Sequence, residues 1–171
     1  MNNAQPARYR WVWFFVVLGV LTTGGIAANV WFNLYQQLTP EKLEQARRLW
    51  QEKGPSGYRL DYTIKREVNA DPAGTVPQNY SVQVNGQKVL VTTTDGKDLE
   101  PSEYEFGSMD SLFDAIARQL RADSDPAHPR AFVKADFDGA DGHVTHYVHS
   151  VMRTRERLEV TVKMTPETNV R

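Results

Sequence analysis

Cysteine is absent from this chain of 171 residues. Disulfide bonds, thiolate zinc sites and cysteine nucleophiles are therefore excluded. An excess of basic charge is also lacking, since 20 Lys and Arg residues face 21 Asp and Glu residues and the formal net charge is -1. Proteins that bind nucleic acid usually present a strongly basic face, so nucleic acid is not an expected partner.

Sequence motifs that carry catalysis or bind cofactors are missing as well. The chain contains no G-x-S-x-G nucleophile motif, no phosphate-binding loop and no dinucleotide-binding glycine motif. We therefore expect no cofactor and assign no catalytic residue, and the sequence does not indicate an enzyme.

Side-chain charge is absent between Arg10 and Glu41. Residues 11–32 read WVWFFVVLGVLTTGGIAANVWF, and as a helix they would be roughly 33 Å long, enough to cross a hydrocarbon core about 30 Å thick. Basic residues precede this stretch and none follows it closely, which predicts that residues 1–10 lie in the cytoplasm. The sequence thus predicts a signal anchor in the inner membrane, with a single transmembrane helix and a periplasmic domain over residues 38–165.

Two alternatives remain open for this segment. Small residues at Gly25 and Ala27 fit a cleaved signal peptide, although the apolar run continues to Tyr35 and favours a retained anchor. Gly24 and Ala28 form a small-xxx-small pair through which two helices can approach, but no other feature of the sequence supports a homodimer.

Helix and strand patterns fill residues 38–165, and residues 166–171 form a tail. Thr39 and Pro40 are typical of the start of a helix, and a second apolar stripe starts at about Ser108. Alternating apolar residues predict strands at 58–68, 80–84, 88–93, 131–137, 143–152 and 158–164. The order α-βββ-α-βββ predicts an α+β fold in which two helices pack on an antiparallel sheet.

The segment DGHVTHYVHS, residues 141–150, contains three evenly spaced histidines. Its β-forming residues predict a strand, in which His143 and His149 would be roughly 20 Å apart and His146 would point to the opposite face. A zinc–nitrogen bond is about 2 Å long, so these histidines are not expected to share one ion. They remain weak metal candidates, and their clustering suggests an interface that responds to pH near 6.5.

Acidic residues offer two further weak candidates. Asp136, Asp138 and Asp141 resemble the start of a calcium loop, but the spacing and Tyr147 at the last position do not fit, and an ordinary turn is favoured. The loop at 94–107 carries carboxylates that could act as an acid–base pair, although a solvated loop is the simpler interpretation: Asp98, Glu100, Glu103 and Glu105.

Residues 45–164 contain four short motifs: Trp50, Gly54, Pro55 and Tyr58; Val82, Val84, Gly86 and Val89; Asp110, Leu112, Phe113 and Ile116; and Phe137-Asp138 through Gly142. In these motifs the chain resembles an uncharacterised family of bacterial envelope domains, a domain of unknown function. It departs from many members in lacking cysteine and in carrying a predicted transmembrane anchor instead of a lipid anchor. The resemblance implies a fold and a location in the cell envelope, and it brings no known activity.

These observations lead to three functional interpretations. The first is a membrane-anchored binding or assembly accessory with a protein partner in the cell envelope. The second is a carrier that holds a lipid or small ligand between the sheet and the helices. The third is an enzyme with an unrecognised carboxylate or histidine site.

Overall fold

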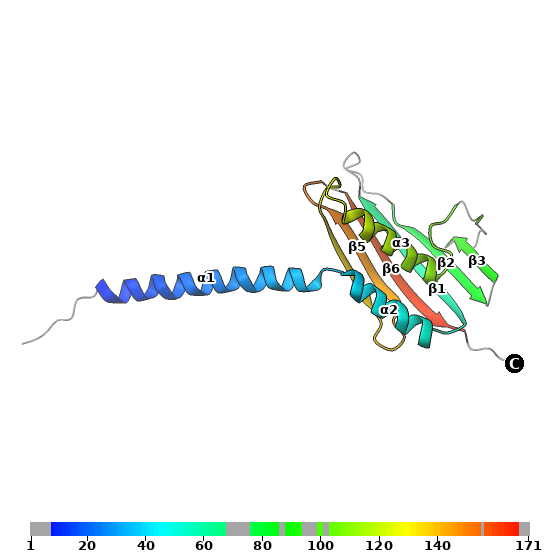
Figure 1. The fold of residues 1–171 in the computed structure, drawn as a ribbon, viewed down its shortest axis with the longest axis horizontal. Coiled ribbons are helices and arrows are strands. Elements are labelled where there is room, and N and C mark those ends of the chain that lie inside the picture. The colour runs from blue at the N-terminus through cyan, green and yellow to red at the C-terminus, as the bar shows by residue number, and fades with distance from the viewer. Residues whose placement is uncertain are drawn as a thin grey trace, which may run out of the picture. The chain divides into compact units, whose positions relative to one another are not determined.

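The chain is described from a computed structural model. The described residues are 8–67, 76–85, 88–93, 99–100, 103–154 and 156–167. The chain divides into two compact units, Met1–Gln37 and Leu38–Arg171 (Figure 1).

The first unit contains helix α1, Arg8–Gln36. Apolar side chains between Trp11 and Leu21 are largely exposed. Further along the helix, the Thr23 hydroxyl donates a hydrogen bond to the Gly19 carbonyl at 2.8 Å. Such back-bonding satisfies a polar side chain within the helix itself.

The transmembrane helix predicted over residues 11–32 is contradicted. Among the residues that the structure describes, no helix is both long enough and apolar enough to span a bilayer. A span needs about 20 predominantly apolar residues, and residues 11–25 of α1 include three glycines and two threonines. The side chain of Ala28 lies outside the described residues, as does any contact it makes with Gly24. The expected location of residues 38–165 outside the cytoplasm is untested and stays a prediction.

Both helices of the second unit begin with side-chain caps. Helix α2, Pro40–Lys53, follows Thr39, whose hydroxyl oxygen accepts a hydrogen bond from the Lys42 N–H at 3.3 Å, which confirms the predicted cap. Helix α3, Met109–Asp123, follows Ser108. Ser108 and Ser111 each accept a hydrogen bond from the other's backbone N–H, at 3.1 and 3.0 Å. These bonds satisfy N–H groups that have no partner within the helix and so fix where each apolar stripe begins.

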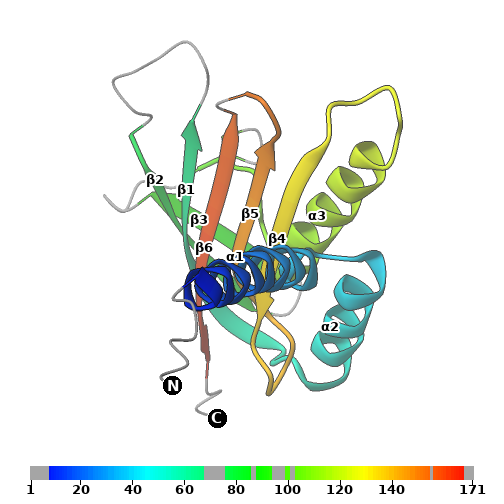
Figure 2. The same cartoon turned by 90° about the vertical axis from the view of Figure 1, so that its left-hand side faces the viewer.

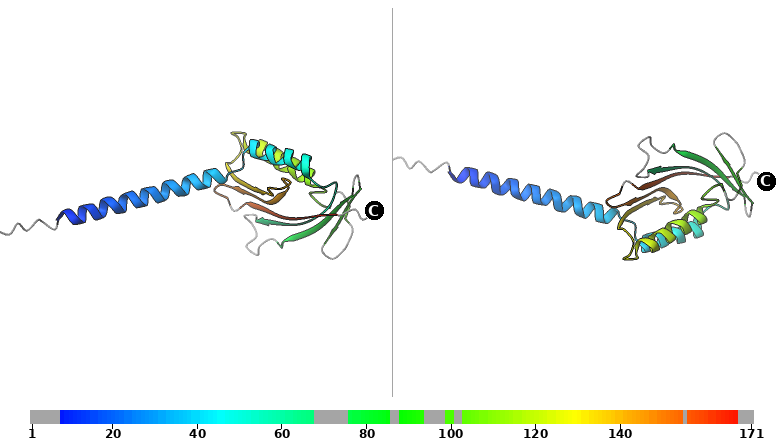
Figure 3. Two further views of the ribbon diagram at one scale, coloured as in Figure 1. Left: turned by 90° about the horizontal axis from the view of Figure 1, so that it is seen from below. Right: turned by 90° about the horizontal axis from the view of Figure 1, so that it is seen from above.

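Six antiparallel strands form one sheet in the order β3-β2-β1-β6-β5-β4. Their bounds are Gly57–Glu67 for β1, Gln78–Asn85 for β2, Lys88–Thr93 for β3, Ala131–Phe137 for β4, Val144–Val151 for β5 and Arg157–Pro166 for β6. Helices α2 and α3 lie together on one face of this sheet (Figures 2 and 3). The α+β architecture predicted from the sequence is therefore confirmed.

A bulge in β5 decides which of its side chains face the helices. Asp136 pairs with His146 and Phe137 pairs with Val144, so Thr145 has no residue opposite it. A bulge shifts the alternation of side chains by one residue. Val144 and Tyr147, which are three residues apart, therefore both point into the core, where they are 0% and 3% exposed.

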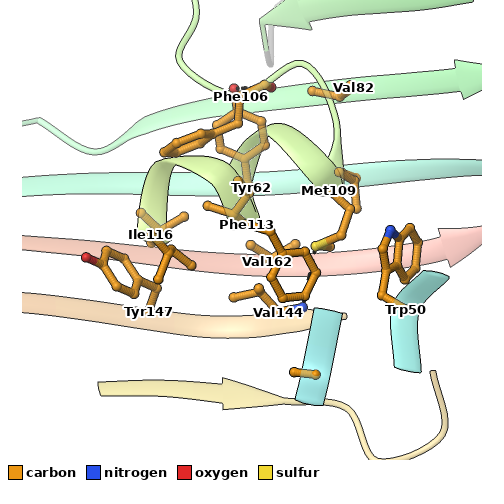
Figure 4. Close-up of a cluster of buried hydrophobic side chains, with 14 of the residues drawn as sticks. Trp50, Tyr62, Val82, Phe106, Met109, Phe113, Ile116, Val144, Tyr147 and Val162 are labelled. Atoms are coloured by element: carbon orange, nitrogen blue, oxygen red, sulfur yellow. Dashed lines mark hydrogen bonds between the residues drawn. The ribbon is translucent and has the colours of Figure 1, made fainter. Parts of the chain in front are cut away.

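The core lies between α3 and the centre of the sheet. Phe113 and Met109 of α3 are fully buried, and Figure 4 shows them packed against residues of several strands. In the same view the ring of Tyr147 lies beside Ile116, and its hydroxyl points away from Phe113. This hydroxyl marks the end of the core where the candidate site begins.

Candidate functional site

The three histidines of the 141–150 segment lie in three different surroundings. Each contacts a carboxylate of its own: His143 contacts Asp141 at 2.6 Å, His146 contacts Glu159 at 3.1 Å, and His149 contacts Asp123 at 3.1 Å. His149 faces α3, whereas His146 lies on the opposite face of the sheet, as the sequence predicted. The structure therefore does not bring the three histidines together.

The β4–β5 turn instead joins one histidine to two of the aspartates. Possible ligand atoms of Asp138, Asp141 and His143 all lie within 4.8 Å of one another. Their polar atoms already have partners, since Asp138 accepts from the Ala140 N–H at 2.7 Å and Asp141 bonds to His143. The chemistry of this set would suit a divalent cation, but each observed bond equally belongs to an ordinary turn.

The remaining candidates of the sequence lie elsewhere. Asp136 contacts Lys134 at 3.2 Å and His146 at 3.5 Å. A hydrogen bond from His146 holds the pKa of the Glu159 carboxyl below its ordinary value, and Arg157 lowers it further. These groups form a polar network on the sheet face opposite α3.

The predicted acidic loop does not form a carboxylate pair in its described part. Glu105 forms an ion pair with Arg66 of β1. Glu103 accepts a hydrogen bond from the Glu100 backbone N–H at 2.9 Å, and Asp98 lies outside the described residues. The acid–base interpretation of this loop thus gains no support.

A pocket lies between the second half of α3 and the sheet, and we call it the α3 pocket. Its volume is about 550 Å³, within the range of about 300–1,000 Å³ typical of small-ligand sites. The lining residues come from β1, the loop before α3, α3 itself, β5 and β6: Arg66, Glu105, Phe106, Leu112, Ala115, Ile116, Arg118, Gln119, Ala122, Tyr147 and Leu158.

The strand register explains how these residues meet. Ile64, Val160 and Tyr147 lie in one row across β1, β6 and β5. The next row toward the end of β1 comprises Arg66, Leu158 and His149. Side chains two residues apart share a face of a strand, so both rows point toward α3, and the apolar core gives way to polar groups at this end.

The Tyr147 hydroxyl is the feature of the α3 pocket that most needs explanation. It is buried, and of the buried side-chain nitrogen and oxygen atoms in the described part of the chain, it alone lacks a hydrogen-bond partner. Burial raises its pKa well above the ordinary value, and the Asp123 carboxylate raises it further, so the group stays a protonated donor at neutral pH. A buried hydroxyl without a partner costs about 1–3 kcal/mol.

Two other buried tyrosines on the same sheet face provide a comparison. The Tyr58 oxygen accepts a hydrogen bond from the Met109 N–H at 3.2 Å. The Tyr62 hydroxyl donates to the Phe106 carbonyl at 3.1 Å. Tyr147 therefore departs from the pattern of its own sheet as well as from the general rule that buried polar groups are paired.

The Asp123 carboxylate next to Tyr147 already has two partners. Asp123 contacts His149 at 3.1 Å, and the Gln119 amide donates to the same carboxylate at 3.2 Å. His149 is 9% exposed. This arrangement connects the last turn of α3 to β5 beside the α3 pocket.

Arg66, Arg118 and Tyr147 were not among the site residues predicted from the sequence. Arg66 carried a usable signal, because it follows Ile64 by two residues on the apolar face of its strand. No sequence pattern identified Tyr147, because the hydrophobic pattern does not reveal the bulge at Thr145 that turns its side chain inward.

No protein-family model matches this chain, and no curated protein is significantly similar to it. The resemblance to a family of envelope domains stays a prediction.

Proposed function

We propose that this protein is a non-catalytic binding module that holds a small, largely apolar ligand in the α3 pocket. The observation that carries the proposal is the buried, unpartnered hydroxyl of Tyr147, a residue of the pocket lining. Such a group is uncommon in native proteins, and a functional role is one of the explanations for it. A ligand oxygen that accepts from Tyr147 would offset that cost.

The composition of the pocket supports binding over catalysis. Apolar side chains of α3 and β6 form most of the wall, including Leu112, Ile116 and Leu158. The carboxylate in the described lining, Glu105, is held by Arg66. A general base must be able to take up a proton, and the protonated Tyr147 does not meet that requirement.

The protein partner that the sequence favours is a separate interpretation. No feature of the described surface adds support to it, and it stays a prediction.

A variant that blocks the pocket tests the proposal. Ala122 is exposed on α3 and lines the pocket, whereas its neighbour Arg121 is exposed and does not. We would denature purified full-length wild-type, Ala122→Trp and Arg121→Trp proteins and identify the released small molecules by mass spectrometry. The wild type and Arg121→Trp should release an apolar molecule that Ala122→Trp lacks.

The Arg121→Trp control is needed because the exposed apolar side chains of α1 can retain lipid in every variant. Material bound to α1 is released equally by all three proteins. Equal release from Ala122→Trp and Arg121→Trp would contradict the proposed function.

A further inference from the structure

The charge balance of the α3 pocket indicates which ligand it suits. The lining contains two arginines and one glutamate. Arg66 and Glu105 neutralise each other in an ion pair. Within the described part of the chain, the exposed Arg118 side chain makes no ion pair or hydrogen bond. The pocket therefore has one uncompensated positive charge.

A second donor belongs to another residue of the lining. Tyr147 is 3% exposed, and its buried hydroxyl has no protein acceptor in the described chain. A carboxylate has two oxygens with about four acceptor positions, so it can accept from an arginine and a hydroxyl at once. The neighbouring Asp123 carboxylate already accepts from the Gln119 amide and contacts His149.

The rest of the wall requires an apolar ligand body. Phe106, Leu112, Ile116 and Leu158 offer no donors from their side chains. A neutral apolar molecule would leave both Arg118 and the buried hydroxyl without a partner, and a cation would be repelled by Arg118.

We infer that the ligand of the α3 pocket is an amphiphile that joins one carboxylate to an apolar body, and that Arg118 and Tyr147 bind the carboxylate. This inference rests on the proposed function of the pocket, and it adds the chemical class of the ligand. Arg118 supplies the charge at the exposed side, and Tyr147 supplies the buried donor.

Calorimetric titration of the full-length protein tests the inference with decanoate, decanol and decyltrimethylammonium, which share one alkyl chain. We expect the wild type to bind decanoate about tenfold more tightly than either of the other probes, because charge-assisted hydrogen bonds are the stronger kind. Arg118→Gln should weaken decanoate binding about five- to tenfold and leave decanol binding unchanged. Arg118→Lys should restore part of the loss, because it keeps the charge but not the planar fork.

Arg121→Gln provides the matched control, since Arg121 is an exposed arginine of the same helix that does not line the pocket. Its affinity for decanoate should equal that of the wild type. Equal losses in Arg118→Gln and Arg121→Gln, or decanol binding as tightly as decanoate, would overturn the carboxylate inference while leaving the pocket a ligand site. Failure of all three probes to bind the wild type would overturn the proposed function and this inference with it.

Discussion

Replacing Tyr147 with phenylalanine removes one oxygen atom and leaves the ring in place. The ring packs beside Ile116 in the core, and the hydroxyl has no partner in the described chain. Because an unpartnered buried hydroxyl costs about 1–3 kcal/mol, Tyr147→Phe should raise the free energy of unfolding by about 1 kcal/mol or more.

Tyr62→Phe is the matched comparison. Tyr62 is as buried as Tyr147, at 3% exposed, but its hydroxyl donates to the Phe106 carbonyl. Its removal leaves that carbonyl unpaired and should lower the free energy of unfolding by about 1–2 kcal/mol. The free energies of unfolding of the two variants should therefore differ by about 2 kcal/mol or more, with changes in opposite directions from the wild type.

Urea denaturation of the full-length proteins, followed by circular dichroism, measures both changes. Ligand binding supplies the second half of the prediction, because Tyr147→Phe should weaken decanoate binding by about tenfold while it stabilises the free protein. General damage to the fold cannot raise stability and lower affinity together. If Tyr147→Phe loses as much stability as Tyr62→Phe, the hydroxyl has a partner in the free protein and the reasoning is refuted.

Three further predictions concern the fold and the polar network. Gly142→Ala should lower the free energy of unfolding by at least about 2 kcal/mol in urea denaturation. Gly142 has a φ of 82°, and a Cβ at this position would lie 2.4 Å from the Ala46 carbonyl oxygen. Gly139→Ala should lose little stability, because a Cβ at Gly139 would meet open space. Phe113→Ala should lower the free energy of unfolding by about 3–5 kcal/mol in the same assay, because the ring of Phe113 is fully buried. The lowered pKa of Glu159 contributes stability that is present above its ordinary value of 4.5 and is lost as the pH falls through the lowered value. Glu159→Gln should therefore show a smaller loss of stability on acidification below pH 4.5, and an unchanged acid dependence would contradict the assigned cause.

The elements of the second unit could be predicted from hydrophobic pattern and turn chemistry. Thr39 and Pro40 indicated the start of α2. Alternating apolar residues indicated each strand to within one residue of its observed ends, except that β2 starts two residues earlier and β6 ends two residues later than predicted. The strands predicted at 80–84 and 88–93 pair with each other as β2 and β3, although Gly86 between them lies outside the described residues. Local patterns suffice for such features because they depend on neighbours in the sequence.

The candidate site could not be predicted because it depends on long-range contacts. Local patterns do not reveal that β1 lies beside β6, which places Arg66 next to Leu158. They also do not reveal that Asp123 reaches His149, 26 residues away. The uncharged pattern of residues 11–32 led instead to the prediction of a membrane span, which is contradicted.

A crystal structure of the full-length protein with bound decanoate would test the central claim most directly. The account predicts ligand density between α3 and β5, with a carboxylate oxygen within hydrogen-bond distance of the Tyr147 hydroxyl and the Arg118 guanidinium, and with the alkyl chain against Ile116 and Leu158. Density for decanoate on α1 with an empty α3 pocket would contradict the claim that this pocket is the binding site.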